Sequence, residues 1–193
     1  MANTNPTHVV TGKVRFSYEH IMKPYANTTN DPSAEPKYSV TVLVPKTDTA
    51  TKARLDAAIK AAKERGVKER RFKDGTPVDR LPSPIYDGDG YRADGYTEFG
   101  PEAKGMWVFT ASCRQEKKPQ VVDAAGNPII DPTEIYSGCW GRVSVDFFPY
   151  SVPQRSGIGC GLCNVQKLTD GEPLGAARPS AEDDFGGDFD PLG

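Results

Sequence analysis

Glycine and proline interrupt this sequence so often that a bundle of long helices does not fit it. The chain has 19 glycines and 17 prolines among 193 residues, which together make about one residue in five, against an average of roughly one in eight. Both residue types mark turns and element ends, so the uninterrupted segments are short. This pattern favours short β-strands joined by turns, and the 37% share of hydrophobic residues is enough to form a core.

Alternating hydrophobic and polar residues predict where the strands lie. A first strand is predicted over residues 9–18, where Val10, Val14, Phe16 and Tyr18 share one face and the basic residues lie on the other. Further strands are predicted over residues 38–44, 106–114, 138–150 and 158–168.

One helix and one long loop complete the pattern. The helix is predicted to begin at Asp48 or Thr49 and to end near Arg65, with Gly66 as its C-terminal cap. Residues 66–105 are polar and broken by glycine and proline, so we expect a long irregular insertion, suited to a functional loop or lid. The element order predicts a mainly β fold, a small Greek-key barrel with one helix between its strands.

Membrane and export signals are not expected. The longest apolar-looking run covers residues 38–45, whereas a membrane span needs about 20 residues. Residues 1–6 lack a cationic start and an apolar stretch, so we expect no secretory signal. We therefore expect a cytoplasmic protein that contacts no membrane and whose four cysteines stay reduced.

Charge divides the chain into a basic body and an acidic end. Residues 179–193 hold five acidic side chains and no lysine or arginine, so residues 1–178 are net positive although the whole chain has a formal net charge of −2. This predicts one folded domain, residues 1–178, and a disordered acidic tail, residues 179–193. Because the tail also holds two phenylalanines, docking onto a partner protein is favoured over a purely solubilising role. The residues predicted to bind the partner are Asp183, Asp184, Phe185, Asp188, Phe189 and Asp190.

The polar strand faces carry both cations and aromatic rings. Trp140, Arg142 and Tyr150 share a face of one predicted strand. Unpaired bases stack on aromatic side chains, and lysine and arginine neutralise phosphates. The alternative is that the rings cap the core and the cations simply face solvent, since alternation does not show which face is covered. The candidate nucleic-acid-binding residues are Lys13, Arg15, Arg114, Lys117, Lys118, Trp140, Arg142, Phe148 and Tyr150.

Little in the sequence points to catalysis. It has no nucleophile elbow, phosphate-binding loop or dinucleotide fingerprint. Cys160 and Cys163 form a single C-x-x-C, but zinc needs two further ligands, and these two positions of a strand face opposite sides. We therefore expect structural thiols, no metal, no cofactor and no enzyme activity. A metal-dependent nuclease using Asp87, Asp89 and Asp94 is the catalytic alternative, disfavoured because these residues lie in a glycine-rich loop.

Several segments taken together resemble a family of phage and prophage proteins. They are residues 14–20, 37–46, 118–123, 135–139 and 164–175, and the last of these is the most specific when read with residues 181–185. This family, long catalogued as a domain of unknown function, is regarded as single-stranded DNA-binding proteins with an OB-fold. The resemblance implies a barrel that binds single strands in a basic cleft, and an acidic tail that contacts replication or recombination proteins.

The sequence hypothesis is thus a phage protein that coats and protects single-stranded DNA without sequence preference, as a monomer or a homodimer. The tail carboxylates are expected to mimic phosphates, to lie over the empty cleft and to be displaced by DNA. The main alternative is a structural or adaptor protein of the virion, in which the tail only adds solubility.

Overall fold

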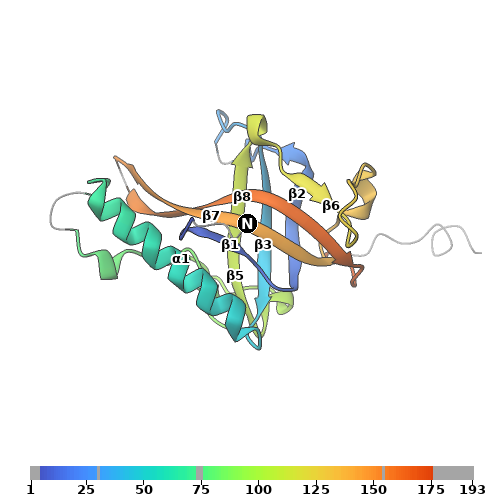
Figure 1. Ribbon diagram of the computed structural model, residues 1–193, viewed down its shortest axis with the longest axis horizontal. Helices are drawn as coiled ribbons and strands as arrows, with labels where there is room; N and C mark the ends of the chain where they lie inside the picture. Colours follow the sequence, from blue (N-terminus) through green and yellow to red (C-terminus); the bar gives the residue numbers. More distant parts are fainter. Residues whose placement is uncertain (1–4, 30, 73–75, 154, 176–193) are drawn as a thin grey trace, which may run out of the picture.

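The computed structural model describes residues 5–29, 31–72, 76–153 and 155–175, and it is built mainly of strands with one long helix (Figure 1). The strands are β1 (His8–Val10), β2 (Val14–Tyr25), β3 (Lys37–Pro45), β4 (Tyr86–Asp87), β5 (Met106–Arg114), β6 (Gln120–Val122), β7 (Trp140–Val152) and β8 (Arg155–Thr169). The helix is α1 (Thr49–Lys68), and short 3-10 helices occupy the connections: η1 (Val78–Arg80), η2 (Pro101–Ala103), η3 (Gln115–Lys117) and η4 (Pro132–Glu134).

Five strands close into a barrel. They pair in the order β7, β2, β3, β5 and β8, and β8 pairs in turn with β7 along its whole length. These pairs are antiparallel except β5–β8, where Ser112 lies opposite Gly161. The short strands β1, β4 and β6 add to β7, β5 and β8 respectively. This five-stranded Greek-key barrel is the OB-fold, so the predicted fold class is confirmed.

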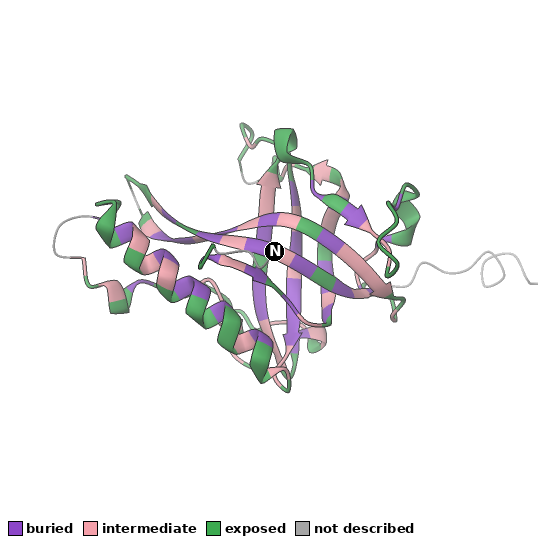
Figure 2. Ribbon diagram, in the orientation of Figure 1, coloured by how far each residue is buried: buried purple, intermediate pink, exposed green. Residues whose placement is uncertain are grey.

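Buried and less buried residues alternate along the barrel strands (Figure 2). The side chains of the buried residues form the core of the barrel. The rings of Phe109 on β5 and Phe147 on β7 have centroids 6.4 Å apart and are almost inaccessible to solvent. Burying such a side chain stabilises the fold by about 1.5–3 kcal/mol. The helix α1 lies along the β7–β8 ribbon and β1, and its buried face completes the core (Figure 1). The core residues that it contributes are Leu55, Ala58, Ile59 and Ala62.

The helix begins as predicted and ends later. Asp48 is the N-cap, and its carboxylate accepts a hydrogen bond of 2.9 Å from the backbone N–H of Thr51. The prediction of Gly66 as the C-cap is wrong: it lies inside the helix, and Arg70 takes the left-handed conformation, with φ of 50°. A Cβ at position 66 would overlap the ring of Phe72 and crowd Pro149, so glycine lets both residues pack closely against the helix. No helix in the described ranges is both long and apolar enough to cross a membrane.

The strand predicted over residues 9–18 is divided into two strands. The chain leaves β1 and bends at Gly12, whose N–H donates a 2.9 Å hydrogen bond to Thr51 Oγ1 on the helix. It then enters β2 at Val14 and joins the barrel between β7 and β3. The continuous alternation of the sequence therefore covers two separate positions in the sheet.

The insertion over residues 66–105 is largely irregular, as predicted, where the structure describes it. Ala103 and Phe99 of the insertion pack on Leu43 of β3 and Val108 of β5, outside the barrel. This second, smaller core holds the insertion against the outer face of β3 and β5.

Candidate nucleic-acid interface

The outer face of β3 and β5 forms a strip with serines and threonines at its centre, a basic pair at one end and an apolar pair at the other. Its cross-strand pairs are Lys37–Arg114, Ser39–Ser112, Thr41–Thr110 and Leu43–Val108. The hydroxyls of Thr41 and Thr110 lie 3.1 Å apart. The insertion covers the Leu43 end, while Lys37 and Arg114 are exposed at the other end. We call this surface the β3–β5 strip. In chain order, β3 and β5 are the second and third strands of the barrel. The outer face of these two strands binds oligonucleotides or oligosaccharides in OB-folds.

Beside the strip, two rings of β7 lie across glycines of β8. Phe148 is the cross-strand partner of Gly159, and Tyr150 is that of Gly157. A Cβ at residue 159 would lie 2.5 Å from Phe148 Cζ, and one at residue 157 would lie 3.1 Å from Tyr150 Oη. Gly161 lies on the same face of β8 as Gly157 and Gly159, and it pairs with Ser112 of the strip. The rings of Phe148 and Tyr150 therefore border the strip. Phe148 keeps 41% of its surface exposed, which leaves the ring accessible to a ligand.

A cavity of about 360 Å³ lies between the strip and the insertion. We call it the cleft. Thr41 and Thr110 of the strip line it, together with Tyr150 from β7. Its other aromatic and charged lining residues are Tyr18, Tyr86, Arg92, Phe99, Glu102 and Phe109. The Arg92 guanidinium carbon lies 5.3 Å from the centre of the Phe99 ring. A cleft of rings beside one arginine matches a planar base with a neighbouring phosphate.

Tyr18 reaches this cleft because β2 is irregular. The register with β3 shifts between Ser17 and His20, and Tyr18 has φ of 43°, which is uncommon for a residue with a side chain. The sequence predicts Val10 and Tyr18 on the core side with Phe16, and this is wrong for both: Phe16 is fully buried, whereas Val10 is 42% and Tyr18 62% exposed. A non-glycine residue held in this conformation often marks a functional position.

Cations gather at the open end of the β3–β5 strip. Lys37 and Arg114 face each other there, Lys117 ends η3, and Lys118 follows it. We call Lys117 and Lys118 the basic turn. All four side chains belong to exposed residues, and in the described part of the chain none lies within 4.0 Å of a carboxylate oxygen. Their charges are therefore available to an anionic ligand.

Trp140 lies at the opposite end of β7 from Tyr150 and does not line the cleft. Lys13 Nζ is 5.5 Å and the Arg15 guanidinium carbon 5.9 Å from the centre of its ring. Arg15 also donates a 2.7 Å hydrogen bond to the backbone carbonyl of Glu172. These three side chains thus form a separate aromatic and basic group, which we call the Trp140 cluster.

Arg142 lies on a third surface. Its Nε donates a 3.0 Å hydrogen bond to the carbonyl of Thr11, and it lines a shallow depression with Val10 and Gln166. The predicted binding residues are therefore divided: Phe148, Tyr150 and the basic turn border the strip, while the Trp140 cluster and Arg142 lie elsewhere. DNA contact at each of them stays a prediction.

Sequence reasoning missed several residues of the strip and cleft. They are Tyr18, Lys37, Tyr86, Arg92 and Phe99. One signal for this region is present in the sequence: glycine recurs at alternate positions 157, 159 and 161, which leaves one strand face without side chains. Aromatic residues at alternate positions of the preceding strand would then be expected to cover it.

A smaller cavity adjoins the cleft, and Tyr18 and Glu102 line both. Leu174 and Gly175 line its far side, and Gly175 is the last residue that the structure describes. The predicted tail residues follow Gly175 in the sequence and lie outside the described residues. They are Asp183, Asp184, Phe185, Asp188, Phe189 and Asp190.

The carboxylates proposed for a nuclease are not gathered for metal binding. Lys46 Nζ lies 2.5 Å from Asp87 and 2.6 Å from Asp89, and its hydrogen bonds lower the pKa of both carboxyl groups. Asp94 instead accepts hydrogen bonds from the backbone N–H groups of its own turn. Within the described ranges these three residues form no shared metal site.

The two cysteines of the C-x-x-C face opposite sides of β8, as predicted. Cys160 is buried in the barrel core, and this burial raises the pKa of its thiol. Cys163 is half-buried on the outer side, where burial and the nearby Asp146 carboxylate raise its pKa to about 12. Both are protonated thiols near neutral pH, which argues against redox pairing.

The closed five-stranded barrel, with an aromatic cleft on its second and third strands, places the protein in the OB-fold class. Within that class, the family model of the Enterobacter phage Enc34 ssDNA-binding protein matches residues 7–191, and the chain belongs to this family. No curated protein matches the chain.

Solved structures of phage proteins share the fold. The single-stranded DNA-binding protein from bacteriophage Enc34 in complex with ssDNA is 28% identical, with a TM-score of 0.69 over 91% of this chain and 97% of that one. Another structure of the Enc34 protein is 29% identical, with a TM-score of 0.66 over 96% of this chain and 97% of that one. The single-stranded DNA-binding protein gp2.5 of bacteriophage T7 is 18% identical, with a TM-score of 0.59 over 89% and 95%, and supports the fold alone.

Proposed function

We propose that this protein binds single-stranded DNA without sequence preference and coats it during phage replication or recombination. The observation that carries the proposal is the placement of Phe148 and Tyr150 over the glycines of β8, beside the β3–β5 strip. Membership of the Enc34 family supports it, as does the structure of the Enc34 protein with ssDNA.

The strand is proposed to run along the strip from its basic end to the cleft. Lys37, Arg114 and the two lysines of the basic turn bind phosphates, which releases counterions and makes the affinity salt-dependent. Phe148 and Tyr150 stack on bases, each contributing about 1–3 kcal/mol whatever the base. Because hydroxyls both donate and accept hydrogen bonds, the serines and threonines of the strip fit any base edge.

The Trp140 cluster is proposed as a second contact for longer strands. Arg15 reaches the Glu172 carbonyl, and the chain from Glu172 continues to Leu174 and Gly175, which line the cavity adjoining the cleft. A strand that leaves the cleft through this cavity would therefore approach Trp140 and Lys13. Arg142 lies away from this route and is the least supported of the predicted contacts.

A comparison of two ring deletions tests the path. Binding of a fluorescent oligothymidylate is measured by anisotropy for Tyr150→Leu and for Trp140→Leu, with circular dichroism to check folding. With an oligonucleotide of about six bases, we expect Tyr150→Leu to weaken binding about five- to hundredfold, and Trp140→Leu to change it less than twofold. A loss only in Trp140→Leu would refute the cleft path, and no salt-sensitive binding by the wild type would favour the virion adaptor.

The acidic tail is proposed as a separate region, residues 179–193, that contacts replication or recombination proteins and competes with DNA. Support comes from its charge and from the position of Gly175, which lines the cavity next to the cleft. The tail starts four residues after Gly175 in the sequence, so we propose that its carboxylates compete for the cations that bind DNA.

We also propose that the protein has no catalytic activity and acts in the cytoplasm of the host cell, as a monomer or a homodimer. The pairing of Asp87 and Asp89 with Lys46 supports the first statement, since one ammonium group already occupies the position between the two carboxylates where a nuclease would need a metal ion. Incubation with Mg²⁺ and labelled single strands separates the readings, because a coating protein protects the DNA and a nuclease degrades it.

A further inference from the structure

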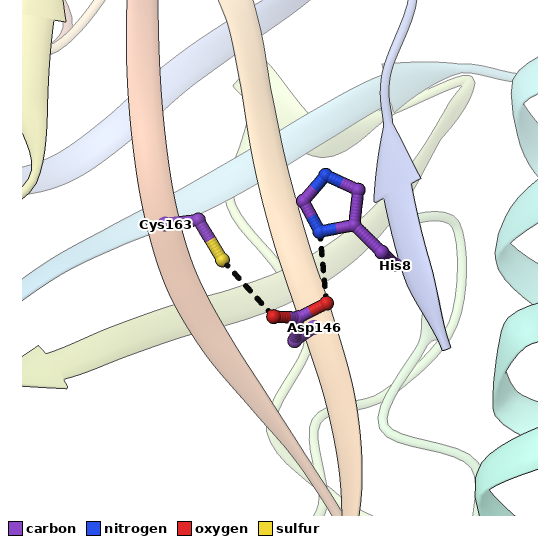
Figure 3. Close-up of side chains that lie close together, drawn as sticks. All are labelled: His8, Asp146 and Cys163. Atoms are coloured by element: carbon purple, nitrogen blue, oxygen red, sulfur yellow. Dashed lines mark hydrogen bonds and ion pairs between the residues drawn. The ribbon is translucent and has the colours of Figure 1, made fainter. Parts of the chain in front are cut away.

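Three side chains from three strands meet on the outer surface of the barrel. His8 comes from β1, Asp146 from β7 and Cys163 from β8 (Figure 3). His8 Nδ1 lies 2.8 Å from Asp146 Oδ1, and Cys163 Sγ lies 3.4 Å from Asp146 Oδ2. A nitrogen, an oxygen and a sulfur atom, one from each residue, all lie within 4.8 Å of one another. The aspartate therefore stands between a histidine and a thiol.

Two features of the sheet bring these three side chains together. His8 is the cross-strand partner of Asp146 in the β1–β7 pair. Cys163 is the extra residue where the β7–β8 register shifts, because Ser144 pairs with Asn164 and Val145 with Leu162. A bulge re-aims the side chain of its extra residue, and here the thiol donates a hydrogen bond to the aspartate on the outer surface.

The surroundings leave the group open to a cation. In the described part of the chain, no lysine or arginine lies within 4.0 Å of the Asp146 carboxylate, in contrast to Asp87 and Asp89, which both pair with Lys46. The positive charge of Lys117 acts on the Cys163 thiol and favours its deprotonated form. The Asn5 amide nitrogen also approaches Asp146 Oδ1, at 3.4 Å. The His8 side chain is 17% and that of Asp146 42% exposed, so the group is sheltered but reachable from solvent.

We propose that His8, Asp146 and Cys163 bind one Zn²⁺ ion through His8 Nδ1, a carboxylate oxygen and the cysteine sulfur. Imidazole, carboxylate and thiolate are all zinc ligands, and a thiolate favours Zn²⁺ over Mg²⁺ or Ca²⁺. Tetrahedral zinc holds such atoms about 3.3–3.8 Å apart, so the widest separation needs to close by about 1.5 Å or less. The thiol proton leaves to solvent as the sulfur binds, and water completes the fourth position.

The ion would join three strands that are otherwise linked by hydrogen bonds. β1 is only three residues long and pairs on one side, with β7. Coordination by His8 would anchor β1 to the barrel, so Zn²⁺ should raise the melting temperature of the protein. A purely structural hydrogen-bonded group would show no such metal dependence.

Cobalt titration of the full-length, tag-free, reduced chain in the absence of oxygen tests the proposal. Co²⁺ substitutes for Zn²⁺, and tetrahedral coordination with a thiolate gives strong visible bands and a sulfur-to-cobalt charge-transfer band. We expect one Co²⁺ per chain with both features, displaced by Zn²⁺. Cys163→Ser should abolish the charge-transfer band and weaken binding at least tenfold, while the matched control Cys113→Ser keeps both.

Two further measurements keep the result unambiguous. His8→Gln, with His20→Gln as its control, should weaken Co²⁺ binding at least tenfold, and Zn²⁺ should raise the melting temperature of the wild type but not of Cys163→Ser. A charge-transfer band that survives in Cys163→Ser would overturn the proposal. So would a wild-type spectrum with only the weak bands of octahedral Co²⁺, which indicates binding by carboxylates and water. Neither outcome depends on DNA binding.

Discussion

The ring of Phe148 lies over Gly159, its cross-strand partner on β8, so closely that a side chain at residue 159 would occupy the position of the ring. Tyr150 and Gly157 repeat the relationship two pairs further along the ribbon. The glycines thus create the space in which aromatic rings border the β3–β5 strip. In the proposed complex, these glycines affect DNA binding indirectly, because they leave the space that the two rings occupy.

Gly159→Ala should therefore reduce DNA affinity by displacing Phe148. The new methyl group would lie 2.5 Å from Phe148 Cζ, so the ring must move. We expect an affinity for a short oligothymidylate several-fold to about tenfold lower, measured by fluorescence anisotropy. Gly161→Ala is the matched control, because its Cβ would meet other atoms only at 3.5 Å or more. Equal affinities of the two variants would contradict the proposal that Phe148 stacks on a base.

Removing a cation from the open end of the strip should change the salt dependence of binding. For Arg114→Gln we expect the slope of log affinity against log salt to fall by about 0.7–1, because one phosphate contact is lost. Lys60→Gln, an exposed position on α1, serves as the control and should leave the slope unchanged. An unaltered slope in Arg114→Gln would remove this residue from the interface.

Deleting residues 179–193 should tighten DNA binding at low salt. The tail carboxylates and the DNA phosphates compete for the same cations, and salt screens this competition. We expect a gain in affinity that shrinks as salt is raised, in titrations of the deleted and full-length chains over a salt series. Identical affinities at every salt concentration would show that the tail does not cover the cleft.

Asp48→Ala should lower the free energy of unfolding by about 1 kcal/mol at neutral pH, because the helix loses its N-cap. Hydrogen bonds from the Thr51 hydroxyl and backbone N–H lower the pKa of Asp48 below its ordinary value. A carboxyl group with a lowered folded pKa stabilises the fold above its unfolded pKa of about 4 and loses this effect as pH falls further. Urea unfolding should thus show a smaller difference between wild type and variant near pH 3 than near pH 7. A difference that is the same at both pH values would argue against this cap.

Much of the fold could be predicted from the sequence because its signals are local. The alternation over residues 138–150 correctly places Val143, Val145 and Phe147 inside the barrel. Helix α1 follows from its cap and its apolar spacing, although its end does not, since Gly66 is explained by Phe72, a residue beyond the helix. Tyr18 was misplaced because a register shift in β2 reverses its direction, and alternation carries no sign of such a shift.

Local sequence signals were not enough to show which residues form the nucleic-acid interface. In sequence, Trp140 and Tyr150 are equivalent outward-facing aromatic residues of one strand, yet only Tyr150 lines the cleft. The sequence by itself determined a β-barrel with one helix and its core residues, because hydrophobic periodicity and turn residues act over a few neighbours. It indicated the family through a different signal, the resemblance of several segments taken together. Only the tertiary structure decided which outward residues share a surface: closure of the barrel brings β8 beside β5 and lays the insertion over β3, and these contacts join residues far apart in the chain.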